Sequence, residues 1–336
     1  MRGRGDNRAV MSLTTSVVLC TYNGARYLAA QWASVLAQSQ LPGEIVVRDD
    51  ASTDPTPELL RRLAADAKAR GVVVRCLPGD RNLGYIANFE VALQAASGDV
   101  LLLCDQDDVW DPQKLARQVA EFEQRPELLL LCGNARRIDA DGRDLQRSLF
   151  EVLRLTQAEL RRIHAGRGFN VLLRRSMATG ATVALRRSLL VDALPFPAGW
   201  VHDEWLAIIS AALGGFDCLE SQLVKYRQHA TNQIGMPERR LSDKWRDLWR
   251  PRSALLGRMI ARGEVLDQRL CNLKRREKPS CRIELAREID HWRVRRALHG
   301  MPWKRVGPIF REMFNGGYSR YGSGWRSALR DLLRHH

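Results

Sequence analysis

Short apolar runs alternate with amphipathic stretches along the first 135 residues of the chain. Five apolar runs have the length and character of buried strands: Ser16–Cys20, Glu44–Arg48, Val72–Leu77, Asp99–Cys104 and Leu128–Cys132. Four stretches between them have the apolar spacing of helices: Arg26–Ala37, Asp54–Arg70, Ile86–Ala96 and Pro112–Gln124. Strands that alternate with helices predict βαβ units, so we expect an α/β fold with a mostly parallel, Rossmann-like sheet flanked by helices.

The pattern becomes less regular after residue 135. It predicts two strands and two helices there: Thr182–Leu185, Val224–Arg227, Arg187–Ala193 and Asp203–Leu213. Beyond Gly235 the pattern is helical and basic. We therefore expect a disordered N-terminus over residues 1–13, an α/β domain over 14–236 with halves at 14–135 and 136–236, and a basic α-helical region over 237–336.

Positive charge is concentrated in the last third of the chain. The 336 residues have a formal net charge of +15, and residues 236–336 contribute 25 lysines and arginines against 11 aspartates and glutamates. Five of the nine tryptophans lie in the same segment: Trp245, Trp249, Trp292, Trp303 and Trp325. Basic residues interleaved with tryptophans are typical of a surface that contacts an anionic bilayer or a nucleic acid, although a solvated helical face has the same composition.

The cysteines and the apolar segments limit the cellular setting. Seven cysteines are scattered without a CxxC pair, which favours buried free thiols in a reducing compartment over a disulfide framework or a zinc site. The stretch Val17–Cys20 is too short for a signal-peptide core, and no segment approaches the roughly 18 apolar residues of a membrane span. We therefore expect a cytoplasmic protein without a membrane-spanning segment.

Carboxylates follow the fourth predicted strand. Asp105, Gln106, Asp107 and Asp108 come directly after an apolar run, and unpaired charges of this kind are too costly to bury in a core. An Asp-x-Asp pair at a strand end can place two oxygen ligands around Mg²⁺ or Mn²⁺, and such an ion would hold a diphosphate. An acidic turn before the next helix is the alternative interpretation.

Polar residues also follow the first three strands. Thr21, Tyr22, Asn23 and Gly24 follow the first strand, Asp49 and Asp50 the second, and Asn82 and Gly84 the third. Helix caps and turns explain each group separately, but in a parallel sheet these strand ends share one edge, where ligands bind. Together they predict a nucleotide site. The chain lacks GxGxxG and GxxxxGK[ST] motifs, which disfavours dinucleotide binding and ATP hydrolysis of the P-loop type.

These motifs, in this order, resemble those of the inverting family-2 glycosyltransferases, which have the GT-A fold. The resemblance covers roughly residues 14–236 and rests on Thr21-Tyr22-Asn23, Asp49–Asp54, Asn82-Leu83-Gly84 and Asp105–Asp108. Two later segments, 200–207 (WVHDEWLA) and 226–235 (YRQHATNQIG), are similar to rhamnosyltransferase-like members. The C-terminal third lies outside the resemblance.

The resemblance implies a nucleotide-diphosphate sugar as donor and Mn²⁺ or Mg²⁺ as cofactor. Thr21 and Tyr22 would contact the nucleobase, with Asp50, or alternatively Asp49, hydrogen-bonded to its ring nitrogen. The remaining donor-site residues would be Asn23, Asn82, Gly84 and Gln106. Asp107 would bind the metal, and Asp105 the ribose or a metal-bound water, and Asp108 could exchange roles with them. His229 would complete the metal shell or bind the diphosphate. A loop histidine without a ligand is the alternative for His229.

The resemblance also implies an acceptor site. Asp203 matches the position of the family's general base, which takes the proton of the attacking acceptor hydroxyl, and Glu204 is the alternative. Asp203 can also serve simply as a helix cap. The acceptor would contact Gly180, Trp200, His202 and Trp205, although core packing explains the tryptophans equally well.

No QxxRW element is present, so the resemblance favours addition of one sugar over processive synthesis. The donor would be dTDP-rhamnose or a UDP-sugar, and the acceptor a glycan or a lipid-linked glycan in polysaccharide biosynthesis of the cell envelope. The basic tail would then dock peripherally on the inner face of the membrane, or mediate homo-oligomerisation. The alternatives are a sugar nucleotidyltransferase and a non-catalytic protein that binds nucleic acid or membrane. A nucleic-acid partner is disfavoured because residues 1–235 are almost neutral.

Overall fold

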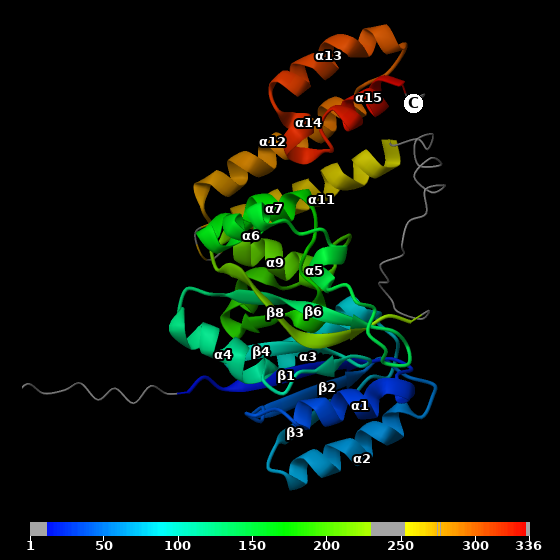
Figure 1. The fold of residues 1–336 in the computed structure, drawn as a ribbon, viewed down its shortest axis with the longest axis vertical. Helices are drawn as coiled ribbons and strands as arrows, with labels where there is room; N and C mark the ends of the chain where they lie inside the picture. The colour runs from blue at the N-terminus through cyan, green and yellow to red at the C-terminus, as the bar shows by residue number, and fades with distance from the viewer. Residues whose placement is uncertain (1–11, 230–252, 274, 276, 334–336) are drawn as a thin grey trace, which may run out of the picture.

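The computed structural model describes residues 12–229, 253–273, 275 and 277–333. Its centre is one mixed sheet, with helices on both faces and a stack of C-terminal helices beyond one of them (Figure 1). The strands are β1 (Thr15–Thr21), β2 (Glu44–Asp49), β3 (Val73–Leu77), β4 (Val100–Asp105), β5 (Val109–Trp110), β6 (Leu130–Ile138), β7 (Ala184–Arg186) and β8 (Phe216–Arg227). Their order across the sheet is β3-β2-β1-β4-β7-β6-β8-β5.

Parallel pairing dominates the sheet. β3, β2, β1 and β4 are parallel neighbours, and β6 pairs with β8 in parallel, whereas β7 and β5 run antiparallel to their neighbours. The chain builds from β1 outward to β3 and then returns to place β4 on the other side of β1. Such a reversal opens a crevice at the carboxyl ends of the two central strands, and these are β1 and β4.

Helices cover the two faces of the sheet. Their bounds are α1 (Ala25–Leu36), α2 (Thr56–Ala69), α3 (Tyr85–Ala95), α4 (Lys114–Gln124), α5 (Leu149–Val152), α6 (Gln157–Arg162), α7 (Gly168–Arg174), α8 (Leu190–Ala193) and α9 (His202–Ala212). Alternate residues of a strand point to opposite faces. Val17 of β1 therefore packs in one apolar cluster with α1, α2 and α4, whereas Val18 packs in another with α3, α7 and α9.

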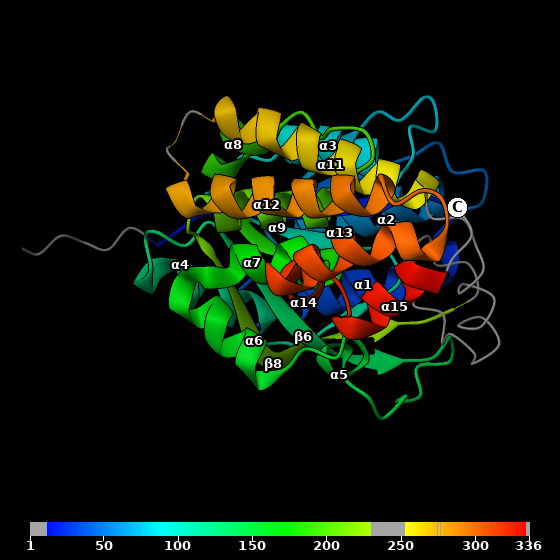
Figure 2. The ribbon, with the colours of Figure 1, turned by 90° about the horizontal axis from the view of Figure 1, so that it is seen from above.

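The C-terminal region is helical, as predicted. It comprises α11 (Ser253–Cys271), α12 (Pro279–Arg296), α13 (Pro302–Phe314), α14 (Gly317–Tyr321) and α15 (Trp325–Leu333). α11 and α12 lie side by side, and Gly263 permits this approach, because a Cβ there would lie 2.7 Å from Cγ1 of Ile289 (Figure 2). Apolar residues of both helices, among them Leu266 and Leu285, belong to the same cluster as α9 and one face of the sheet.

The predicted elements of the first 135 residues are present, with ends shifted by a few residues. The later prediction was incomplete. β8 spans Phe216–Arg227 rather than its last four residues, and the polar stretch in its middle pairs with β6 across register shifts. A 3₁₀ turn, η2 (Gly180–Thr182), replaces the start of the predicted strand at residue 182, and a second one, η3 (Arg187–Leu189), precedes α8. β5 and α5–α7 were not predicted, because short elements carry little periodicity.

Two further expectations concern the thiols and the membrane. All seven cysteines are free, but Cys76 and Cys271 are exposed, which corrects the expectation that every one is buried. Within the described ranges, no helix has the length and apolar character that crossing a bilayer requires. The expected disorder of residues 1–13 and the boundary at 236 fall largely outside the described residues.

Candidate active site

The polar groups that follow β1, β2 and β4 meet at one edge of the sheet. Thr21 lies beside Asp49 in the β1–β2 register, and Cys20 lies beside Asp105 in the β1–β4 register. This edge is on the side of Figure 1 where α1 begins. The structure therefore brings the predicted donor-site motifs together at the carboxyl ends of the two central strands.

Gln106 fastens the loop after β1 to the end of β4. Its Oε1 accepts a hydrogen bond from the Tyr22 N–H (2.8 Å), and its Nε2 donates one to the Tyr22 carbonyl (2.9 Å). A Cβ on Gly24 would lie 2.1 Å from Oε1 of Gln106, so only glycine allows this contact. The ring of Tyr22 remains 37% exposed beside the loop, where a planar base can stack on it.

Asn23 and Asp49 join the β1 loop to the β2 loop. Asn23, with a positive φ of 48°, accepts a hydrogen bond from the Thr53 N–H (2.9 Å). Asp49 accepts hydrogen bonds from the hydroxyls of Thr21 (2.7 Å) and Ser52 (2.6 Å) and from the Ser52 N–H (2.8 Å). These contacts give the loops one shape, and they engage both oxygens of the Asp49 carboxylate.

Asp50 is turned into the protein. Its side chain is 2% exposed, forms an ion pair with Arg48 (2.9 Å) and accepts hydrogen bonds from the N–H groups of Leu83 (2.9 Å) and Gly84 (2.8 Å). Gly84 has φ 81° and ψ 155°, a conformation that essentially only glycine adopts. Asn82 closes the same turn by accepting a hydrogen bond from the Gly84 N–H (3.0 Å). Asp50 thus shapes the loop after β3 and has no face toward solvent.

The described residues bring Asp107 and His229 into contact. Nε2 of His229 lies 2.7 Å from Oδ2 of Asp107, although the two residues are 122 positions apart. The ring of Tyr27 stacks on the imidazole with centroids 5.0 Å apart. Arg227 supports the arrangement, because its Nε donates a hydrogen bond to the Asp107 carbonyl (2.7 Å). A carboxylate and an imidazole therefore lie within ligand distance at the end of β4.

Asp105 and Asp108 behave differently from Asp107. Burial and the charges of Asp107 and Asp203 raise the pKa of Asp105 to about 7. Asp108 is fully buried and accepts a hydrogen bond from the Arg227 N–H (2.8 Å), and burial raises its pKa well above the usual range. The Asp108 side chain thus holds the end of β8 and does not face the solvent. The sequence had suggested that Asp108 could exchange roles with Asp105 and Asp107. Asp105 and Asp107 are only partly buried.

Asp203 is held at the start of α9. Its Oδ2 accepts a hydrogen bond from the Gly180 N–H (2.9 Å), and its Oδ1 accepts one from the Glu204 N–H (2.7 Å). Burial raises the pKa of Asp203 to about 7, and the neighbouring Glu204 charge adds to the rise. A Cβ on Gly180 would lie 3.8 Å from Oδ2 of Asp203 and 3.9 Å from Oδ2 of Asp105, so both carboxylates flank this glycine.

The other expected acceptor-site residues are largely buried. Trp205 is completely buried and donates a hydrogen bond to the Ala193 carbonyl (2.7 Å), so its ring has no face for a sugar. Trp200 is 9% exposed, and the Arg262 guanidinium covers its ring at 4.0 Å. His202 stacks on Phe89 with centroids 4.4 Å apart, and burial lowers its pKa to about 3. Glu204 is paired with Arg262 (2.7 Å).

Sequence reasoning missed Arg227, Tyr27 and Lys114. Arg227 belongs to a quoted motif, but its contacts with the loop after β4 depend on how β8 is placed. Lys114 is fully buried behind Asp105 and Asp108, with its Nζ 3.6 Å from the centroid of the Trp110 ring, and burial lowers its pKa to about 7. No pattern in the sequence distinguishes it from an exposed lysine in the first turn of a helix.

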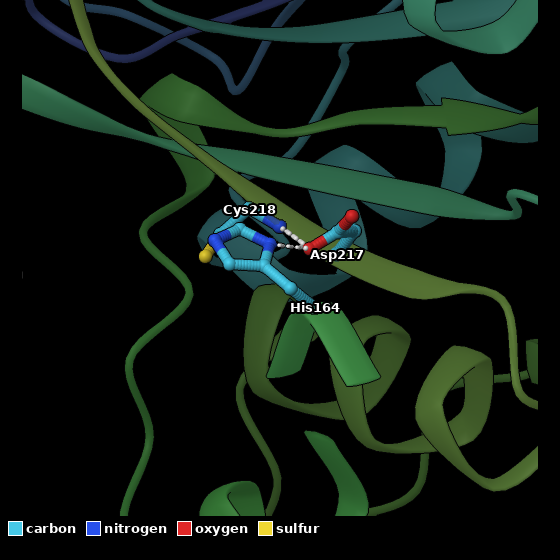
Figure 3. Close-up of side chains that lie close together, drawn as sticks. All are labelled: His164, Asp217 and Cys218. Atoms are coloured by element: carbon cyan, nitrogen blue, oxygen red, sulfur yellow. Dashed lines mark hydrogen bonds and ion pairs between the residues drawn. The ribbon is translucent and has the colours of Figure 1, made fainter. Parts of the chain in front are cut away.

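A second cluster of potential ligands lies at the opposite end of β8. Nδ1 of His164 lies 2.7 Å from Oδ1 of Asp217, with Cys218 beside them (Figure 3). Arg125 pairs with the other oxygen of Asp217, and burial raises the pKa of the Cys218 thiol to about 12. Since both carboxylate oxygens are engaged, this cluster fastens the π-helical turn η1 (Ile163–Arg167) to β8.

A comparison with protein-family models identifies the domain that contains this sheet edge. The model of glycosyl transferase family 2 matches residues 16–193, which is more than half of the chain and includes the loops after β1, β2, β3 and β4. The chain belongs to glycosyl transferase family 2. This identification confirms the family expected from the motifs.

Relatives and solved structures agree with the family. An uncharacterised protein of Mycobacterium tuberculosis (strain H37Rv) is 31% identical over 220 residues, and the match covers 64% of this chain and 59% of that protein. An uncharacterised glycosyltransferase of Nostoc sp. (strain PCC 7120) is 30% identical over 229 residues, which is 65% of each chain. TarS of S. aureus (residues 1–349), solved in complex with UDP-GlcNAc, has a TM-score of 0.54 at 17% identity, covering 95% of this chain and 80% of that one. The chain thus contains a glycosyltransferase domain with the GT-A fold.

Proposed function

We propose that this protein transfers one sugar, with inversion, from a nucleotide-diphosphate sugar to a hydroxyl of a glycan or lipid-linked glycan. The convergence of Asp105, Asp107, His229 and Asp203 carries the proposal. Asp107 contacts His229, and Asp105 and Asp203 flank Gly180. Both pairs lie at the sheet edge where β1 and β4 end. A family 2 domain and the GT-A fold give this edge of the sheet its context.

The donor set fits Mn²⁺ or Mg²⁺. Two carboxylates and an imidazole are ligands that these ions accept. Burial, together with repulsion from the charges of Asp107 and Asp203, raises the pKa of Asp105 to about 7. A cation among them would relieve that repulsion. Asp105, Asp107 and His229 would hold the ion, whose chemistry is to neutralise the diphosphate as it leaves.

Asp203 would act as the general base. The acceptor hydroxyl forms its bond to the anomeric carbon on the face opposite the diphosphate, the bond to the diphosphate breaks, and the hydroxyl proton passes to the Asp203 carboxylate. The hydrogen bonds from Gly180 and Glu204 orient that carboxylate, and its raised pKa makes it a stronger base than an ordinary aspartate. The Arg262 ion pair engages Glu204 and leaves Asp203 as the base.

Two resemblances bear on the identity of the nucleotide and the sugar. The segments around Asp203 and His229 resemble rhamnosyltransferases, which favours dTDP-rhamnose, whereas the complex of TarS with UDP-GlcNAc favours UDP. We place the reaction in polysaccharide assembly at the cytoplasmic face of the membrane, with addition of a single residue per acceptor.

Calorimetric titration with UDP, dTDP, GDP and their sugars, with and without Mn²⁺ or Mg²⁺, tests the donor site. We expect the wild type to bind UDP or dTDP species only with metal. Binding should be at least tenfold weaker in Asp107→Ala, because this variant removes the proposed metal ligand that contacts His229. Asp66→Ala, which alters an exposed carboxylate on α2, is the matched control and should bind normally. Failure of every nucleotide to bind under either metal would contradict the proposal.

A further inference from the structure

The outermost C-terminal helices expose apolar side chains. Of the seventeen large hydrophobic residues exposed among the described residues, nine lie between positions 301 and 333. Trp303 and Phe310 on α13 are 68% and 67% exposed, and Phe314 at its end is 95% exposed. Residues three, four and seven apart share a helix face, so Trp303, Val306 and Phe310 form one stripe, and Trp325 and Leu329 form another on α15.

The inward faces of these helices carry charged side chains beside the buried Ile309 and Ala328. Arg305 of α13 is 4% exposed and donates hydrogen bonds to the Asp331 carbonyl (3.3 Å) and to the Gly300 carbonyl. Asp331 of α15 is 3% exposed and pairs with the buried Arg295 of α12 (2.6 Å). A helix on the surface of a soluble domain normally buries its apolar stripe. α13 and α15 bury Ile309 and Ala328 beside charged groups but leave most of their large apolar side chains outward.

Every exposed charge on this part of the molecule is positive. Residues 301–333 contain only two carboxylates, and both are directed inward, Asp331 to Arg295 and Glu312 to His291 (2.6 Å). The exposed or half-exposed basic residues near the apolar stripes are Lys304, Arg311, Arg320, Arg326 and Arg330. The surface therefore has apolar stripes bordered by cations, with no exposed carboxylate among them.

We propose that this surface, formed by Trp303, Val306, Phe310, Phe314, Trp325 and Leu329 and their basic neighbours, docks on an anionic phospholipid bilayer. Aromatic and aliphatic side chains would enter the boundary between headgroups and acyl chains, while lysine and arginine would contact lipid phosphates. This docking does not depend on the proposed transfer reaction. Figure 1 places the end of α15 on the same side of the molecule as the carboxyl ends of β1 and β4.

The charge pattern favours a bilayer over two other occupants. A symmetric contact with a second copy would place the same cations against one another with no carboxylate to pair them, and like charges brought together oppose association. A nucleic acid would satisfy the cations but would leave Val306, Phe314 and Leu329 without an apolar environment. An anionic bilayer supplies negative charge and an apolar phase together.

Flotation of the full chain with vesicles tests the docking. We expect the wild type to bind vesicles of phosphatidylcholine with phosphatidylglycerol, and to bind phosphatidylcholine alone at least tenfold more weakly. Trp303→Ser/Phe310→Ser/Trp325→Ser should lose at least ninety per cent of the bound fraction. Arg311→Gln/Arg326→Gln should retain weak binding that no longer depends on lipid charge. Val191→Ser/Ile283→Ser, which alters similarly exposed residues elsewhere, is the control and should float like the wild type.

Three controls keep the test decisive. Circular dichroism and nucleotide binding must be unchanged in the triple variant, and if they are not, Phe314→Ser and Trp325→Ser are tested singly. A wild type that is dimeric in light scattering without lipid, and becomes monomeric in the triple variant, would assign the surface to a second copy and overturn the proposal. Equal binding to both lipid mixtures, or binding that a short RNA displaces, would overturn it as well.

Discussion

Asp203 illustrates how a single residue acquires chemistry from its surroundings. Its position at the start of α9 suits a helix cap or first-turn acid, and the sequence left both roles open beside catalysis. The structure adds two hydrogen bonds, the proximity of Asp105 and a pKa raised to about 7. The Gly180 hydrogen bond and the proximity of Asp105 come from segments distant in sequence, which the local sequence cannot reveal.

The pH dependence of activity follows from this pKa. A carboxyl group whose pKa is raised to about 7 is protonated below that pH and cannot accept the acceptor's proton. We expect kcat/KM, measured at saturating Mn²⁺, to rise about tenfold per pH unit up to about pH 7 and then to level off. Asp203→Asn should lower kcat/KM by roughly 10² to 10⁴ and abolish this limb. Glu204→Gln should retain it, and a limb that survives in Asp203→Asn would exclude Asp203 as the base.

The other expected site residues fall into two groups, those at the sheet edge and those whose side chains are buried. Tyr22, Asn23, Asp105, Asp107 and His229 were predicted from the sequence, and the structure places all of them at one edge of the sheet. Their individual roles in binding and catalysis stay predictions. The side chains of Asp50, Asp108 and Trp205 are buried, because each is drawn into a contact with a segment far along the chain or into the core.

At the scale of elements, α11 connects the C-terminal region to the candidate active site. Arg262 of α11 pairs with Glu204 (2.7 Å) and covers the Trp200 ring, and its carbonyl accepts a hydrogen bond from the Trp200 Nε1–H (3.3 Å). Arg269, two turns along, donates hydrogen bonds to the carbonyls of Asp192 and Leu194 (both 3.0 Å). α11 thus supports both ends of the segment that leads into α9.

Removal of the Arg262 charge should change the pKa of Asp203. In Arg262→Ala the Glu204 carboxylate loses its partner, so its negative charge raises the pKa of Asp203 further, by roughly half a unit for a pair that is partly exposed. We expect the acid limb of kcat/KM to move upward accordingly, and Arg262→Lys to restore part of the shift. Arg258→Ala, on the exposed side of the same helix, should leave the profile unchanged. An unchanged profile in Arg262→Ala would show that the ion pair is structural only.

Elements were predictable where periodicity is strong. The strands and helices of the first 135 residues have pure apolar runs and clear turn residues, so their types and order were predicted correctly. β8 was recognised only at its end, because Glu220 and Gln222 interrupt the apolar pattern and β6 supplies the pairing. Where stability comes from a partner strand, local pattern loses its predictive value.

At the scale of the whole molecule, α11 and α12 share an apolar core with the sheet. Leu285 of α12 and Leu266 of α11 are completely buried in the cluster that also contains α9 and Val18 of β1. The sequence suggested a separate basic region beyond residue 236. The shared cluster instead predicts that these two helices and the catalytic domain unfold together.

Leu285→Ala tests this coupling. The cavity should lower the free energy of unfolding by about 2–5 kcal/mol. Urea transitions followed by circular dichroism and by tryptophan fluorescence should shift together and remain coincident. Ile283→Ala, two residues away and 54% exposed, should change stability by less than about 0.5 kcal/mol. Separate transitions in Leu285→Ala, with the sheet unaffected, would contradict the shared core.

The sequence by itself determined the α/β class, the strand-end motifs, the family and the basic, tryptophan-containing tail, because these depend on residue type and short-range spacing. Tertiary structure decided which carboxylates remain accessible, which arginine pairs with Glu204, and that α13 and α15 leave large apolar side chains exposed. The physical reason is that burial and charge pairing are set by residues that are distant in sequence and adjacent only in the fold. Two aspartates of similar local sequence can therefore differ in burial, one lining a crevice and the other lying beneath a strand, and only the folded structure distinguishes them.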